Sequence, residues 1–164
     1  MKRFWLLVFA FGCAAGGKGG ELADCDADGL SGMASADVDG IDWTASDGSW
    51  MEAGSSIQIN LESDIGLNLN LRAIRSSSGD SIADLLSAGA LPVVVDLAGE
   101  DGSGSIMDQR SGLDSYASSQ PGGSGSMSLL GLEGSTLTAC FSFDAVNSDG
   151  VIMLVRDGKV QIDG

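Results

Sequence analysis

The chain has 164 residues, which is enough for one domain with a single modest core. Its 23 acidic and 8 basic residues give a formal charge of −15, which disfavours nucleic-acid binding because that depends on cationic side chains. Hydrophobic residues make up 43% of the chain, which excludes a wholly disordered protein despite the 25 glycines.

The first residues have the pattern of a bacterial secretion signal. Lys2-Arg3 forms a short basic region, the apolar run Phe4–Phe11 follows, and Gly12 directly precedes Cys13. A helix of that length spans only about 12 Å, too little for a transmembrane anchor. We therefore expect residues 1–12 to be a cleaved signal peptide. The residues before Cys13 resemble a lipobox, which implies that the Cys13 sulfur carries a lipid after cleavage.

The three cysteines favour the same interpretation. An odd number of cysteines in a secreted protein leaves one reactive thiol. If Cys13 carries a lipid, Cys25 and Cys140 remain to form a disulfide in an oxidising compartment. The alternative is ordinary signal cleavage, with Cys13 left free or removed.

Residues 13–32 are predicted to be a lipidated, flexible, acidic tether, because they are rich in glycine and lack apolar periodicity. Within the tether, Asp24, Asp26 and Asp28 alternate before a glycine, as the oxygen ligands of calcium loops do. The twelfth position of such a loop holds Ser35 instead of the usual Glu. We expect no cofactor; calcium at this triplet is the one candidate, and a solvated acidic tether is the alternative.

From residue 33 onward, apolar and polar residues alternate, as in strands with one buried and one exposed face. The alternation is clearest in residues 41–45, 57–61, 67–72 and 137–143.

Turn signals separate the predicted strands. Asp39-Gly40 and Asp157-Gly158 are predicted to form two-residue hairpin turns, and Ser76–Gly79 and Asn147–Gly150 to form longer turns. Val151–Val155 is apolar throughout, which predicts a strand that is covered on both faces or central in its sheet.

One segment has helical periodicity. In Asp80–Gly89, the side chains of Ile82, Leu85 and Leu86 share one helical face. Residues 99–125, rich in glycine and serine, are predicted to be a mobile loop around one or two weak strands. The predicted fold class is therefore all-β: an antiparallel β-sandwich or barrel-like domain over residues 33–164, with eight to ten strands and one short helix.

Cys140 alternates with Phe141 and Phe143, so its side chain is expected to point away from the core. A disulfide with Cys25 would then hold the tether across the outer face of the penultimate strand.

The segments 34–45, 123–125, 140–145 and 157–160 together resemble a family of small, uncharacterised envelope lipoproteins of the Bacteroidetes type. The first segment is similar to the family's opening hairpin, with an aromatic at Trp43. The others are similar to its Gly-Ser-Gly lead, its aromatic strand and its Gly-Lys finish. The resemblance implies a β-sandwich-like lipoprotein fold and no assigned chemistry.

Several catalytic classes are excluded by composition. The chain has no histidine, which excludes Ser-His-Asp and Cys-His catalysis and zinc or haem sites that use histidine. No phosphate-binding or dinucleotide-binding glycine motif is present. Carboxylates are abundant, so a carboxylate-dependent hydrolase stays an alternative. Trp43 is predicted to lie in the core, whereas Trp50 and Tyr116 lie near turns and are candidates for stacking on a ligand.

The sequence thus predicts a membrane-anchored envelope lipoprotein that is not an enzyme and acts as a binding or structural module. Its expected location is the bacterial cell envelope, anchored by lipid at the outer membrane and facing the periplasm or the surface. The expected partners are the membrane and an envelope protein or glycan, and no nucleic acid. A β-barrel with an internal pocket for a small molecule or glycan is the first alternative.

Overall fold

The computed structural model describes residues 25, 30, 32–110 and 112–164. The predicted signal peptide (residues 1–12), the lipid attachment residue Cys13 and the candidate calcium ligands Asp24, Asp26 and Asp28 lie outside the described residues.

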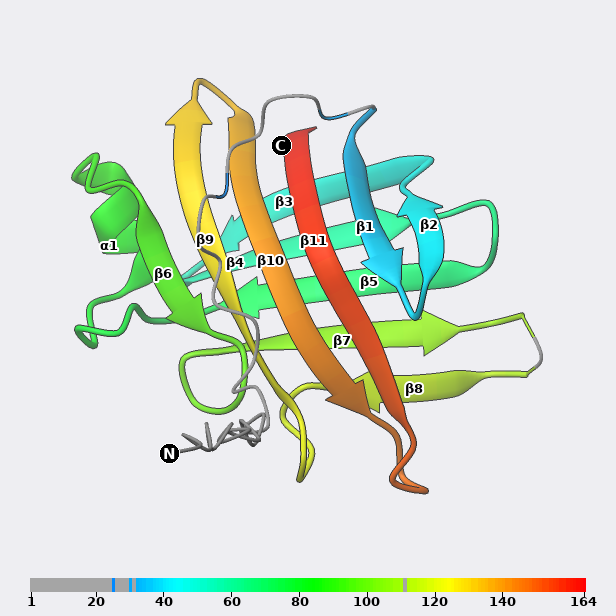
Figure 1. Ribbon diagram of the computed structural model, residues 1–164. Helices are drawn as coiled ribbons and strands as arrows, with labels where there is room; N and C mark the ends of the chain where they lie inside the picture. Colours follow the sequence, from blue (N-terminus) through cyan, green and yellow to red (C-terminus); the bar gives the residue numbers. More distant parts are fainter. Residues whose placement is uncertain (1–24, 26–29, 31, 111) are drawn as a thin grey trace, which may run out of the picture.

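The described chain is all-β with one short helix, as the sequence predicts. It forms one continuous antiparallel sheet that curls into a half-barrel of two crossing layers (Figure 1). The first layer holds, in spatial order, β6 (Val93–Asp96), β9 (Ser124–Glu133), β10 (Thr136–Val146), β11 (Ile152–Asp163), β1 (Ala34–Val38) and β2 (Ile41–Thr44). The second holds β8 (Asp114–Ala117), β7 (Gly102–Asp108), β5 (Leu67–Ala73), β4 (Ser56–Glu62) and β3 (Asp47–Ala53).

The strand β10 joins the two layers. Along most of its length one edge of β10 pairs with β9, and at its end Val146 pairs with Ala117 of β8. The same long strand therefore belongs to the first layer and leads into the second. The described residues form eleven strands, slightly more than the predicted eight to ten.

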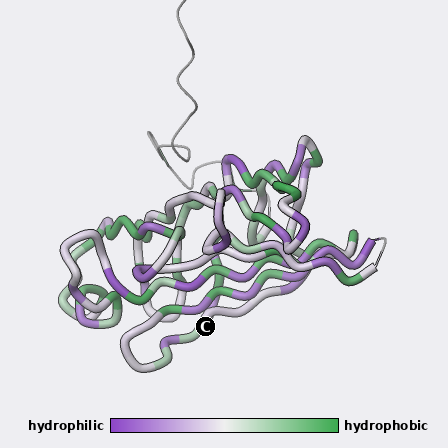
Figure 2. The backbone as a smooth tube through the Cα atoms, turned by 90° about the horizontal axis from the view of Figure 1, so that it is seen from below, coloured by the Kyte–Doolittle hydropathy of each residue, from purple (hydrophilic) through white to green (hydrophobic). Residues whose placement is uncertain are grey.

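The core fills the space between the two layers. Hydrophilic and hydrophobic residues alternate along the strands (Figure 2). The hydrophobic residues of these strands are the ones that form the buried cluster. Trp43, Phe141 and Phe143 are the largest fully buried side chains, which confirms the core position predicted for Trp43. The indole nitrogen of Trp43 donates a hydrogen bond to the carbonyl of Leu67 (2.8 Å), which links the two layers.

The helix α1 (Ile82–Ser87) confirms the predicted helical segment. Ile82 and Leu86 are buried in the core cluster, and Leu85 packs against it partly buried. Gly89 follows the helix with φ of +69°, the left-handed conformation expected after a helix C-terminus. No helix within the described part of the chain is long and apolar enough to cross a membrane.

One of the two predicted hairpin turns is confirmed and the other is wrong. Asp39-Gly40 joins β1 to β2, both residues having positive φ. Asp157-Gly158 instead lies inside β11, at an irregularity in its pairing with β10. The reason is steric: a Cβ atom at Gly158 would lie 2.4 Å from the ring of Phe141, so the glycine makes room for that ring.

Of the two alternatives predicted for Val151–Val155, two-sided burial or a central position, the structure confirms the central position. The strand β11 is central in the first layer, between β10 and β1. Only one of its faces is covered: Met153 and Val155 are buried, whereas Ile152 and Leu154 are exposed.

The glycine-rich segment 99–125 contains two strands, as predicted, but β7 is not a weak one. It pairs over its whole length with β5, and β8 pairs on its other side. Ring atoms of Phe143 lie 3.0 Å from where a Cβ atom of Gly104 would be. The glycines of β7 thus permit close packing of the two layers.

We expect Gly158→Ala to lower the free energy of unfolding by about 1–3 kcal/mol, because the added methyl group would overlap the Phe141 ring and the backbone beside it. Urea unfolding monitored by tryptophan fluorescence measures this. The matched control is Gly131→Ala in β9, where a Cβ atom would have no neighbour within 4 Å. Equal stability of the two variants would contradict the packing role.

Candidate functional site

The outer face of the second layer gathers carboxamide and hydroxyl side chains. Its central row runs across four strands, with Ser49 beside Asn60, Asn60 beside Asn70, and Asn70 beside Ser105. The neighbouring rows contribute Gln58 and Asn68. We call this surface the amide face and define it by six side chains: Ser49, Gln58, Asn60, Asn68, Asn70 and Ser105.

The amide face holds three of the four asparagines in the chain; the fourth, Asn147, lies in the turn before β11. Its three asparagines and Gln58 alternate with leucine and isoleucine in β4 and β5. By itself this alternation predicts only that each of the two strands has one polar, outward-facing side. The clustering of three asparagines within Asn60–Asn70 is the sequence signal that could have identified this face.

Hydrogen bonds orient three of these carboxamides. Asn70 Nδ2 donates to Asn60 Oδ1 across the strand pair. The backbone N–H of Ser63 donates to Asn68 Oδ1 (3.3 Å). A carboxamide has two donor hydrogens and two acceptor lone pairs, so each of these side chains retains further hydrogen-bonding capacity toward solvent.

Two shallow depressions lie on the amide face. One, of about 310 Å³, spans β4, β5, β7 and β8 and is lined by Asn60, Asn68, Asn70 and Ser105 among others. The other, of about 160 Å³, continues over β3 and includes Ser49. Asn60 and Glu62 line both, so the two depressions adjoin along β4.

Few charged side chains lie on this side of the molecule. Arg72 stands between Gln58 and Ser103 in the row beside the central one. Asp47, the first residue of β3, and Glu62, the last residue of β4, are cross-strand partners, and both are exposed. Both carboxylates line the smaller depression, so the acidic side chains of this surface lie together at one end of it.

The two aromatic candidates from the sequence lie elsewhere. Tyr116 is buried, with its side chain in the core cluster. Trp50 is half-buried against that cluster, and its indole nitrogen donates to the carbonyl of Ser135 (2.7 Å). Neither ring is presented as an open stacking platform. Within the described residues, no group of three or more carboxylates, cysteines or histidines is arranged to hold a metal ion.

The opposite side of the molecule carries the disulfide. Cys25 and Cys140 are joined, with Cα atoms 6.2 Å apart, within the usual span of about 4.4–6.8 Å. Cys140 lies on the outer face of β10, between its cross-strand partners Ser128 and Lys159, and is 2% exposed. The disulfide therefore holds Cys25 against the outer face of the first layer, as the sequence predicts, with the core between it and the amide face.

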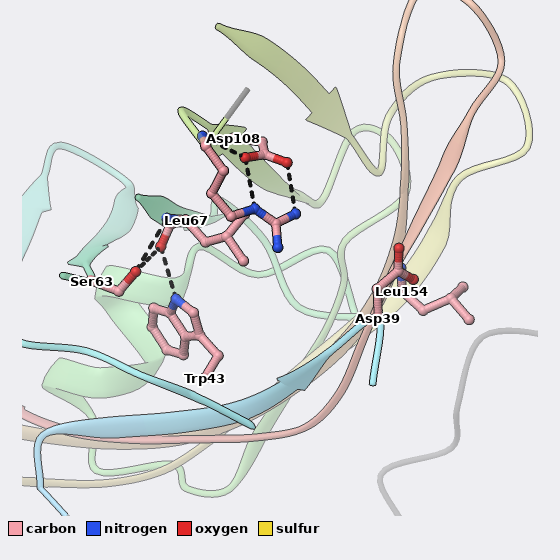
Figure 3. A network of polar contacts seen from close by, with 7 residues as sticks. Asp39, Trp43, Ser63, Leu67, Asp108 and Leu154 are labelled. Carbon is pink, nitrogen blue, oxygen red and sulfur yellow. Dashed lines mark hydrogen bonds and ion pairs between the residues drawn. The ribbon is translucent and has the colours of Figure 1, made fainter. Parts of the chain in front are cut away.

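Figure 3 shows polar contacts made by Asp39 of the β1–β2 turn and by Asp108 at the end of β7. Asp39 and Leu154 exchange two hydrogen bonds, the backbone N–H of Asp39 to the carbonyl of Leu154 and the backbone N–H of Leu154 to Asp39 Oδ1. Asp108 accepts two side-chain hydrogen bonds from Arg110, at 3.0 and 2.8 Å.

These contacts shift three pKa values. The side-chain hydrogen bonds from Arg110 lower the pKa of the Asp108 carboxyl, against the opposing effect of its burial. The same hydrogen bonds raise the pKa of the Arg110 guanidinium. Burial, and then the nearby carboxylates led by Asp114, raise the pKa of the Tyr116 hydroxyl. All three groups keep their ordinary charge at neutral pH, which indicates a structural role.

Comparison with known proteins adds no further assignment: the chain matches no family model, no curated protein and no solved structure. The resemblance to envelope lipoproteins stays a prediction.

We expect Cys25→Ala with Cys140→Ala to lower the free energy of unfolding by about 4–5 kcal/mol, because the disulfide closes a loop of 115 residues. Urea unfolding of the double variant measures this. Reduction of the native protein with dithiothreitol is the control and should produce a similar loss. A loss below about 1 kcal/mol in both experiments would mean that the disulfide does not contribute to the fold.

We expect Asp108→Asn to lower the free energy of unfolding by about 1–2 kcal/mol at pH 7, because the charge-assisted hydrogen bonds to Arg110 are weakened. The folded-state pKa of Asp108 is depressed, so its contribution is present above the ordinary pKa of an aspartate and is lost as pH falls through the folded value. The difference between native and variant should therefore shrink in acid. Urea unfolding at pH 7 and below pH 4 measures this.

The control is Asp64→Asn, since Asp64 is exposed in the β4–β5 turn. It should change the stability by no more than about 0.5 kcal/mol at either pH. A difference between native protein and Asp108→Asn that does not depend on pH would contradict the assigned ion pair.

Proposed function

We propose that the chain is a lipid-anchored lipoprotein of the bacterial cell envelope whose β domain is a non-catalytic binding module. The observation that carries the proposal is the pairing of Cys25 with Cys140. It accounts for two of the three cysteines and leaves only Cys13, directly after a short basic and apolar leader, for lipid attachment.

The arrangement of the two outer faces supports a display role. Cys25 is 12 residues after Cys13, so the chain between them reaches at most about 40 Å. The domain would thus stay close to the membrane, attached through the outer face of its first layer. The amide face, on the other side of the core, would then point away from the point of attachment and be accessible to a ligand.

The filled core favours binding on the outside of the domain. Twenty-nine buried residues form one continuous hydrophobic cluster between the layers. Within the described residues, every buried side-chain polar atom has a hydrogen-bond partner, so the core presents no unpaired polar group to an internal ligand. These observations support a surface module over the barrel with an internal pocket. The outer membrane, facing the periplasm or the surface, is the location that we propose.

We expect the mature protein, expressed with its own leader and extracted from the envelope in mild detergent, to have the mass of residues 13–164 plus an acylated glyceryl group, less two hydrogens for the disulfide. Intact mass spectrometry measures this. The control is Cys13→Ser, which removes the lipid acceptor and leaves Cys25 and Cys140 unchanged. It should lack the lipid mass and leave the membrane fraction.

An unlipidated native chain, or native and Cys13→Ser chains that fractionate in the same way, would overturn the proposed anchor.

A further inference from the structure

We propose that the amide face binds a neutral polysaccharide. This inference deepens the proposed function by naming the ligand class of the binding module, and it rests on that function for the module's role. Four observations of the described residues carry it: the clustering of carboxamides, their hydrogen-bonding capacity, the lack of charged side chains in the central row, and the open, extended form of the surface.

The clustering is pronounced. Three of the chain's four asparagines point outward from two adjacent strands, β4 and β5, and hydroxyls of Ser49 and Ser105 flank them. Outward positions of a solvated sheet are normally filled by a mixture in which charged residues are frequent. The chain has 23 acidic residues, yet the central row of this face contains none.

The hydrogen-bonding chemistry fits sugar hydroxyls. A hydroxyl both donates and accepts, and a carboxamide offers a donor and an acceptor side by side. The Asn70–Asn60 hydrogen bond fixes which atoms of this pair remain for a ligand, since it uses one donor hydrogen of Asn70 and one lone pair of Asn60. A surface whose carboxamides are already oriented loses less side-chain entropy on binding.

The charge distribution selects a neutral ligand. An anionic polysaccharide would meet the carboxylates of Asp47 and Glu62 and the net charge of −15 of the chain. A cationic ligand would be attracted to the many exposed acids away from this face more than to a row of neutral side chains. A neutral polysaccharide meets neither penalty at the central row.

The form of the surface indicates a chain rather than a small ligand. The depressions of about 310 and 160 Å³ adjoin and together cross five strands from β8 to β3. Pockets for small ligands are usually closed and mostly apolar, whereas these are open to solvent and lined by carboxamides, hydroxyls and carboxylates as well as by apolar side chains. No exposed aromatic ring lies among the residues that line them, so we expect weak binding per site, strengthened where many anchored copies meet one polymer.

The test is affinity electrophoresis of the full chain in native gels that contain dextran, mannan or a soluble β-glucan, with polygalacturonate as the anionic comparison. The detergent should have a polyoxyethylene headgroup, because sugar headgroups would compete. We expect at least one neutral polysaccharide to retard the native protein and polygalacturonate not to do so.

The discriminating variant is Asn70→Asp, which removes the donor to Asn60 and adds a charge in the central row. It should weaken the retardation about tenfold or more, equivalent to at least about 1.4 kcal/mol. The matched control is Asn147→Asp, the same change at the one asparagine outside the face. Asn147 Oδ1 only accepts backbone hydrogen bonds, from Asp149 and Val151, and an aspartate can keep these.

A measurement on the native protein makes the test independent of variant folding. In ¹⁵N-correlated NMR spectra recorded with the retarding polysaccharide, side-chain amide signals of Asn60, Asn68 and Asn70 should shift, and those of Asn147 should not.

Lack of retardation by any of the neutral polysaccharides, or equal retardation of Asn70→Asp and Asn147→Asp, would overturn the inference. The inference would also be overturned if the native protein formed a dimer that Asn70→Asp dissociates, since the amide face would then bind a second copy of the chain. Because electrophoresis and NMR use extracted protein, their outcome is separate from that of the lipid test: either proposal can fail while the other stands.

Discussion

Phe141 and Phe143 pack directly against glycine backbone, and the close spacing of the half-barrel follows from these contacts. Both rings belong to β10, with centroids 6.3 Å apart, and both are fully buried. Phe141 occupies the space that a side chain at Gly158 of β11 would need. Phe143 lies in the same way over Gly104 of β7, in the other layer. The contact of Phe141 with Gly158 lies within the first layer, whereas that of Phe143 with the bare backbone of Gly104 crosses between the layers and allows them to approach closely.

Because buried side chains occupy the space between the layers, a ligand would have to bind to one of the two outer faces. The first layer has its outer face partly occupied, because the disulfide brings Cys25 onto β10. The second layer has an outer face whose polar side chains are mostly neutral. A flat, neutral sheet carries a risk of edge-to-edge association, and the edge strand β3 counters it with the exposed carboxylates of Asp47 and Glu52. The other edge strands, β2 and β6, have only four residues each.

Much of the fold could be predicted from the sequence because its signals are local. Alternation in β4, β5 and β10, the Asp39-Gly40 turn and the helix α1 each depend on residues close together in the chain. The error at Asp157-Gly158 concerns a glycine whose role depends on a distant partner. Gly158 has the local pattern of a turn, and only the ring of Phe141 on the neighbouring strand explains why it lies within β11. The apolar run Val151–Val155 predicts either two-sided burial or a central strand, and only the sheet order, with β11 between β10 and β1, decides between them.

The candidate site was harder to predict, for a physical reason. Asn60 and Asn70 are ten positions apart, and only the register of β4 with β5 places them side by side. Ser105 joins the row through the pairing of β5 with β7, across a segment that the sequence presents as a loop. A binding surface on a sheet is thus a property of register, and strand patterns alone do not determine it. The disulfide is different, because three cysteines allow few pairings and the predicted lipidation of Cys13 would leave a single pair. The disulfide could therefore be predicted from the sequence, whereas the amide face emerges only when the strands are aligned.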